Sequence, residues 1–186
     1  MSVSIRVSLV KPSETQKVLD FVQERYQREY GISPDDLLQV CFAAWKEETL
    51  LGAISLEFQQ GQNLFELEKL LDFNPVYLLT QPRDEMVNFG RWASIDDIAS
   101  RALAFRAVQF SMNQGKSVAI AVSKPRVLSY LKKKYSLKFN LFHVKMREVP
   151  GVKFFRQGVK PIVYAWQLSD WAEALAKEIS PIINFE

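Results

Sequence analysis

Met86-Val87-Asn88-Phe89-Gly90-Arg91-Trp92-Ala93-Ser94 is the stretch that decides the fold. Its apolar composition is typical of a buried β-strand, and a glycine lies at its centre. Glycine inside a strand marks either a β-bulge or the close approach of another part of the chain. We therefore expect a strand over residues 86–94 with a local irregularity near Gly90.

The residues that follow predict a crossover to a second strand. Ser94-Ile95-Asp96-Asp97 can begin a long helix, apolar residues then recur at helical spacing, and Gly115 ends it. Residues 117–123 form an apolar run, as expected for a strand buried on both faces. A strand, a helix and a strand in this order place the two strands parallel in one sheet.

The same patterns extend along the rest of the chain. Strand-like segments cover residues 3–10, 39–46, 50–59, 136–147 and 161–168. Helical segments cover residues 13–30, 63–71, 125–134 and 170–179. This order predicts the α/β (α+β) class with a mixed sheet. No repeat divides the 186 residues, so we expect a single domain over residues 1–186.

The composition excludes several classes of protein. Apolar residues make up 48% of the chain, which is typical of a globular protein with a core. No apolar run approaches the roughly 20 residues of a membrane span, so we expect no membrane span and a cytoplasmic protein. The single cysteine, Cys41, and the single histidine, His143, argue for a reducing compartment and against a zinc site.

Positive charge is concentrated in residues 124–160. This segment holds eleven basic residues and one acidic residue, a net charge of +10, against −7 for the rest of the chain. Such a field attracts phosphates, acidic proteins or nucleic acid, although a solvated lysine-rich face explains it equally well. Aromatic residues interleave with the charges, as nucleic-acid stacking requires. The predicted strands assign several of these aromatics to the core, so nucleic acid is the less favoured partner.

The element order resembles the GNAT superfamily of acyl-CoA N-acyltransferases. Three segments carry the resemblance, namely the strand 86–94, the strand 117–123 and the helix Val127-Leu128-Ser129-Tyr130-Leu131-Lys132-Lys133-Lys134-Tyr135. The autoinducer synthases and the thermostable haemolysin family are the most similar branches, since both insert a helix where residues 63–71 lie. The resemblance implies a mostly antiparallel sheet, a V-shaped splay between the fourth and fifth strands, and helices on both faces.

The resemblance also implies a function. An acyl group would pass from a thioester, either acyl-CoA or the acyl-phosphopantetheine of an acyl-carrier protein, to a small-molecule amine, without a metal. The thioester would enter the splay. The residues implied to bind the donor are Phe89, Gly90, Trp92, Ala93, Ser94, Ser123, Arg126 and Lys132.

Two residues are implied to take part in catalysis. Tyr130 matches the family tyrosine that protonates the departing thiolate, although a tyrosine packed on the sheet is an equal alternative. Arg91 is implied to orient the acceptor, since a guanidinium binds carboxylates and carbonyls. An ion pair of Arg91 with Glu85 or Glu57 is the alternative. Ser123 has an alternative role as the cap of the next helix.

The sequence also departs from the family pattern. The loop before the long helix contains no glycine, and Asp96 and Asp97 stand where a pyrophosphate would approach. We expect these carboxylates to cap the helix and repel the phosphates. Asn88 replaces the fourth-strand glutamate and cannot accept a proton. A donor on acyl-carrier protein carries one phosphate, so it does not need the glycine-rich loop. A binding or regulatory module without catalysis would need neither that loop nor the fourth-strand glutamate.

Overall fold

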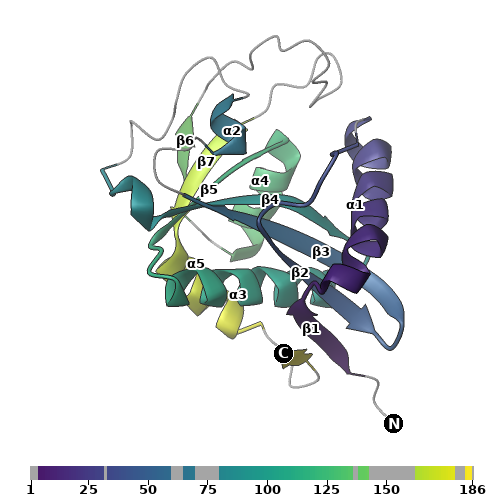
Figure 1. The fold of residues 1–186 in the computed structure, drawn as a ribbon. Helices are drawn as coiled ribbons and strands as arrows, with labels where there is room; N and C mark the ends of the chain where they lie inside the picture. The colour runs from purple at the N-terminus through teal and green to yellow at the C-terminus, as the bar shows by residue number, and fades with distance from the viewer. Residues whose placement is uncertain are drawn as a thin grey trace.

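A mixed sheet of eight strands forms the centre of the protein in the computed structural model (Figure 1). The structure describes residues 4–31, 33–59, 65–69, 80–135, 138–142, 162–178 and 183–185. The order across the sheet is β6-β7-β5-β4-β3-β2-β1-β8. The strands are β1 (Ile5–Leu9), β2 (Val40–Lys46), β3 (Thr49–Phe58), β4 (Met86–Ser94), β5 (Val118–Ser123), β6 (Asn140–Phe142), β7 (Ile162–Gln167) and β8 (Ile183–Phe185).

Helices cover both faces of this sheet, as the resemblance implies. On one face lie α1 (Thr15–Tyr30) and α2 (Glu66–Lys69); on the other lie α3 (Asp97–Asn113), α4 (Pro125–Tyr135) and α5 (Leu168–Ala176). The face under α1 buries Val18 and Val22 against Ala43 and Ala53. The opposite face joins α3, α4 and α5 in one apolar core that includes Trp171. In the described part of the chain, no helix is both long and apolar enough to cross a bilayer.

The splay between β4 and β5 is present. The two strands pair in parallel from Met86–Val118 to Asn88–Ile120, and the pairing ends there. Beyond that point β4 stays with β3 as far as Ser94, while β5 stays with β7 as far as Ser123. The carboxyl-terminal halves of β4 and β5 therefore form the two arms of a V.

A bulge interrupts β4 where one arm of the V begins. Ser55 of β3 pairs with Gly90, but Ala53 pairs with Ala93, so β4 contains one extra residue. The left-handed conformation falls on Arg91, with a φ of 49°. At Gly90 another part of the chain comes close, because a Cβ there would lie 2.8 Å from Cδ1 of Leu38. Both features that a strand glycine indicates are thus found, on adjacent residues.

Most predicted elements are confirmed, and one strand is new. Gly31 and Gly115 adopt left-handed conformations just after α1 and α3, where the sequence predicts the ends of helices. The sequence did not predict β8, which pairs in parallel with β1. Of the predicted helix 63–71, α2 lies within the described residues. Residues 143–161, with His143 and much of the basic segment, lie outside them.

Candidate active site in the splay between β4 and β5

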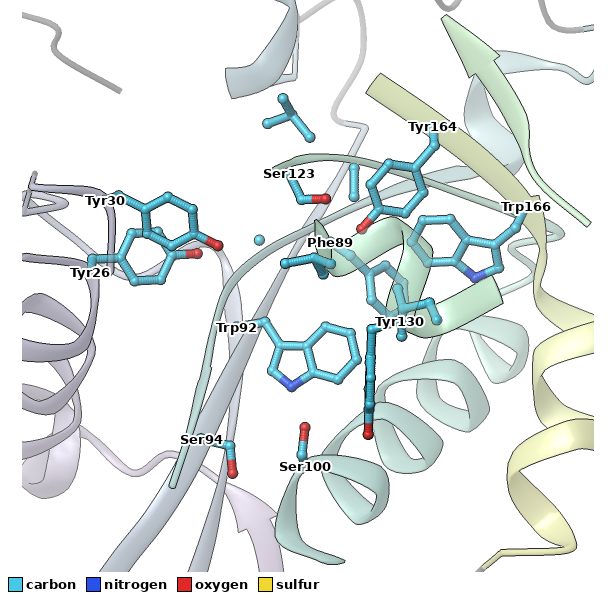
Figure 2. Close-up of a pocket in the computed structure, with 15 residues that line it drawn as sticks. Tyr26, Tyr30, Phe89, Trp92, Ser94, Ser100, Ser123, Tyr130, Tyr164 and Trp166 are labelled. Carbon is cyan, nitrogen blue, oxygen red and sulfur yellow. The ribbon is translucent and has the colours of Figure 1, made fainter. Parts of the chain in front are cut away.

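A cavity of about 230 Å³ occupies the splay. Its walls come from α1, β4, α3, β5, α4 and β7, so helices from both faces of the sheet line it (Figure 2). Aromatic and aliphatic side chains provide much of the lining, and serine and tyrosine hydroxyls provide the rest. Such a lining suits a long apolar ligand that carries a few polar atoms.

Six of the ten predicted site residues meet at this cavity. They are Phe89, Gly90, Trp92, Ser94, Ser123 and Tyr130. Phe89 packs edge-on against Trp166 of β7, with ring centroids 5.4 Å apart. The arms of the V therefore bring together residues that are more than thirty positions apart in the sequence.

The other four predicted residues lie elsewhere. Ala93 is buried on the opposite face of β4, in the core under α1, because side chains of successive strand residues point to opposite faces. Arg126 and Lys132 are exposed on α4. Arg126 forms an ion pair with Glu29 at the end of α1. The fourth residue, Arg91, belongs to a separate network of charged groups.

Arg91 is buried in this network behind the bulge. Its side chain is 5% exposed, and its Nη2 lies 2.6 Å from Oε1 of Glu66 and 3.3 Å from Oδ1 of Asp36. Its Nε donates to the backbone carbonyl of Asp36 at 3.0 Å. Burial by itself would lower the pKa of Arg91, but its interactions with Glu66, Tyr26 and Asp36 together outweigh burial and raise it. The guanidinium therefore stays charged and holds the bulge against α2 and the Asp36 loop.

The ion-pair partners expected for Arg91 are both engaged with other groups. Glu57 accepts a hydrogen bond from the Asn88 amide at 2.8 Å and from the backbone N–H of Glu66 at 2.9 Å. Glu85 accepts a hydrogen bond from the hydroxyl of Ser117 at 2.7 Å. The expected ion pair of Arg91 with an acid is confirmed, but the acids are Glu66 and Asp36 and not Glu57 or Glu85, because the left-handed turn at the bulge directs the side chain to them. Within the described ranges, no three His, Cys, Asp or Glu residues are placed to share a metal ion.

The start of α3 is occupied by its own carboxylates. Asp96 is the N-cap, and its Oδ1 accepts the N–H of Ala99 at 2.7 Å, which confirms that an aspartate caps this helix. Asp97 pairs with Arg101 and accepts a hydrogen bond from the Tyr130 hydroxyl at 3.0 Å. The negative groups thus stand at the positive end of the helix dipole, where they are stabilised and where a diphosphate would meet repulsion.

Three tyrosines that the sequence did not single out also line the cavity. Tyr26 and Tyr30 come from α1, with ring centroids 5.0 Å apart, and Tyr164 comes from β7. In Figure 2 the hydroxyls of Tyr26 and Tyr30 point toward the side of the cavity that carries Ser123 and Tyr164. Burial raises the pKa of all three phenols, so they remain protonated at neutral pH.

A cluster of charged groups lies beside Tyr30 of the cavity wall. The ammonium of Lys124 donates to the backbone carbonyl of Glu29 and lies 4.3 Å from the ring centroid of Tyr30. The side chain of Glu29 pairs with Arg126. These contacts join the end of α1 to the start of α4 across the open end of the V.

The sequence by itself matches no protein-family model and no curated protein sequence. The fold, in contrast, is shared with solved enzymes. BjaI, described as a CoA-dependent acyl-homoserine lactone synthase with SAM and isopentyl-CoA, aligns over 98% of this chain and 93% of its own, with a TM-score of 0.63 and 11% identity. The fold of this protein is the GNAT fold.

Two further structures show the same likeness. FeeM, described as an N-acyl amino acid synthase from uncultured soil microbes, aligns over 95% of this chain and 100% of its own, with a TM-score of 0.63 and 15% identity. The AHL synthase LasI aligns over 95% of each chain, with a TM-score of 0.62 and 11% identity. The likeness therefore covers nearly the whole of this chain.

Proposed function

We propose that this protein transfers an acyl group from a phosphopantetheine thioester to an amine within the cavity of the splay. The observation that carries the proposal is the place of the cavity. It begins where the pairing of β4 and β5 ends, at Asn88–Ile120, and it runs between the two arms to α3 and α4. A thin, extended ligand fits such a passage, and solved enzymes of the same fold carry acyl-CoA or act as acyl transferases.

The lining supports a thioester with an apolar chain. Phe89, Trp92, Leu131 and Trp166 present apolar surface, and Ser100 and Ser123 add hydroxyl oxygens that suit the amides of the pantetheine arm. The volume of about 230 Å³ is below the roughly 300–1,000 Å³ of a pocket for a whole drug-sized ligand. We therefore expect the cavity to hold the acyl end of the donor, with the phosphate outside.

The arm of β4 supplies the polarisation that acyl transfer needs. Past Asn88 this arm no longer pairs with β5, and Phe89, Gly90 and Trp92 face the cavity. We expect backbone N–H groups of this arm to donate to the thioester carbonyl, where negative charge develops as the amine attacks. The transfer proposed here needs no metal.

A carrier protein suits the donor side better than CoA does. The start of α3 presents Asp96 and Asp97, and the Asp96 carboxylate already binds the N–H of Ala99. The 3′-phospho-ADP of CoA would meet these charges, whereas a carrier-bound arm brings one phosphate. Lys132 and Lys133 are exposed on α4, the helix that also carries Tyr130 of the cavity wall, and they complement an acidic carrier protein.

A ligand-binding assay with a matched pair of variants tests the proposal. Octanoyl-CoA and octanoyl-acyl-carrier protein are added to the wild type, and melting temperature and thiol release with an amine are measured. A ligand at about 100 times its Kd adds about 2.7 kcal/mol to the stability of the folded state. Ser100→Phe narrows the cavity, while Ser129→Phe makes the same change on the exposed side of α4.

We expect the melting shift and thiol release in the wild type and in Ser129→Phe, and the loss of both in Ser100→Phe. The absence of any shift in the wild type would refute the proposal. A shift without thiol release for any amine would favour a regulatory module that binds acyl thioesters. A shift that Ser100→Phe leaves intact would place the ligand outside the splay.

A further inference from the structure

Tyr164 reaches the splay from the strand beyond it. β7 pairs with β5 so that Tyr164 stands opposite Ala121, on the face that also carries Ser123. The small side chain of Ala121 leaves room for the phenol ring to lie across β5. Tyr164 is 3% exposed, and Figure 2 shows its hydroxyl directed into the cavity beside Ser123.

The ring of Tyr164 is held on both sides. It stacks on Trp166 with ring centroids 5.3 Å apart and an interplanar angle of 24°. Phe139 packs edge-on against it, with a centroid distance of 5.4 Å. The hydroxyl therefore occupies one place in the cavity and needs little reorganisation when a ligand arrives, which is the property of a preorganised donor.

The hydroxyl is a hydrogen-bond donor at neutral pH. Burial raises the pKa of Tyr164 to about 12, against the opposing effect of its hydrogen bond with Ser123. The Ser123 hydroxyl donates to the backbone carbonyl of Lys124 at 3.3 Å, so its oxygen can accept the phenol proton until the carbonyl of a bound ligand takes its place. A thiol has a pKa of about 8.5, so a phenol of this kind is a poor acid for a departing thiolate. It is well suited to hydrogen-bond an oxyanion while it keeps its proton.

We propose that the Tyr164 hydroxyl donates to the carbonyl oxygen of the bound thioester and stabilises the oxyanion that forms during transfer. This inference rests on the proposed function. The amine nitrogen bonds to the carbonyl carbon, and the C=O electron pair moves to oxygen. The pair then returns, the C–S bond breaks, and sulfur leaves with its electrons. The proton lost by nitrogen ends on sulfur, and Tyr164 keeps its own.

The other tyrosines of the cavity are placed for other tasks. The Tyr130 hydroxyl donates to Asp97 at the start of α3, and the residue is 49% exposed. Tyr26 and Tyr30 come from the opposite side of the sheet, on α1. Among the described tyrosines, Tyr164 combines near-complete burial with a strand position next to the β5 arm.

Infrared spectroscopy of the bound donor tests the proposal without knowledge of the natural acceptor. Octanoyl-CoA, or octanoyl-acyl-carrier protein where that binds better, carries a ¹³C-labelled carbonyl. Hydrogen bonding lowers the stretching frequency of a carbonyl. We expect a lowered frequency in the wild type and a return toward the value in water in Tyr164→Phe, which keeps the ring that packs on Trp166.

Kinetics with hydroxylamine as a small, uncharged amine give the second readout. Loss of one oxyanion donor lowers kcat by about 100- to 1,000-fold. We expect a fall of this size in Tyr164→Phe with KM changed by less than about threefold, and a smaller fall in Tyr130→Phe, whose hydroxyl is engaged by Asp97.

The possible outcomes separate the two proposals. A wild type that binds neither donor refutes the proposed function. A wild type that binds, with the same carbonyl frequency in Tyr164→Phe, overturns the role of Tyr164 and leaves the function standing. If Tyr164→Phe does not fold, 3,5-difluorotyrosine at position 164 decides the matter. This more acidic phenol must lower the carbonyl frequency further, and an unchanged frequency overturns the inference.

Discussion

Glu66→Gln is expected to destabilise the protein by about 2 kcal/mol. Gln keeps the size of the side chain and one oxygen for Arg91, so the change removes little besides the charge. The hydrogen bond keeps its charged donor but loses its charged acceptor, so we take the loss in the bond itself as about 1 kcal/mol. The guanidinium of Arg91 is 5% exposed, and another carboxylate that pairs with it, on Asp36, is 76% exposed. Water screens that pair, and the poorly compensated buried charge adds about a further 1 kcal/mol.

Urea unfolding at pH 7 measures this effect. A loss of about 2 kcal/mol corresponds to a fall of about 4–8 °C in melting temperature for a chain of this size. Arg91→Met is combined with Glu66→Gln in a double-mutant cycle, and we expect the two losses to be less than additive. The control is Glu173→Gln, which breaks an exposed pair with Lys177 and should cost at most about 0.5 kcal/mol. Equal effects of the two glutamine variants would refute the reasoning.

Two further predictions concern stability. Burial raises the pKa of Cys41 from 9.0 to about 11 and that of Tyr164 from 10.0 to about 12. Both groups bind their protons more tightly in the folded state than in the unfolded state. Their contribution to the free energy of unfolding is therefore complete below about pH 9 and is lost as the pH rises through their pKa values in the folded state. The free energy of unfolding should therefore fall by about 3–4 kcal/mol between pH 8.5 and 11, with a later onset in Cys41→Ala; a flat profile would contradict this. In Gly52→Ala, the new Cβ would lie 2.9 Å from the carbonyl oxygen of Ala93, and thermal unfolding should show a loss of about 1–3 kcal/mol. A melting temperature equal to that of the wild type would contradict this prediction, because it would show that β3 and β4 can move apart at this point without a loss of stability.

The elements of the fold could be predicted because their signals are local. The apolar runs of β4 and β5 give both strands within one residue of their observed bounds. Gly31 and Gly115 mark helix ends because left-handed backbone costs glycine little. Strand β8 was missed because three residues beside β1 are too few to form a recognisable alternation.

The candidate site could be predicted in part. The β4 residues that face the cavity follow from the strand assignment, since one run of sequence carries them. The surroundings of Arg91 could not be predicted, because its partners lie 25 and 55 positions away in the sequence. The bulge also turns its side chain to the face opposite to the one that strand alternation predicts. The place of Tyr26 and Tyr164 could not be predicted either, because they come from the first helix and the seventh strand.

The sequence by itself determined the order of strands and helices, the long crossover between β4 and β5, and the absence of a glycine-rich loop before α3. Each of these depends on residues within a few positions of one another. Only the tertiary structure decided where β4 and β5 part, which charges compensate Arg91, and which phenol faces the cavity. Those features depend on distances between residues remote in sequence, because packing of whole elements sets them.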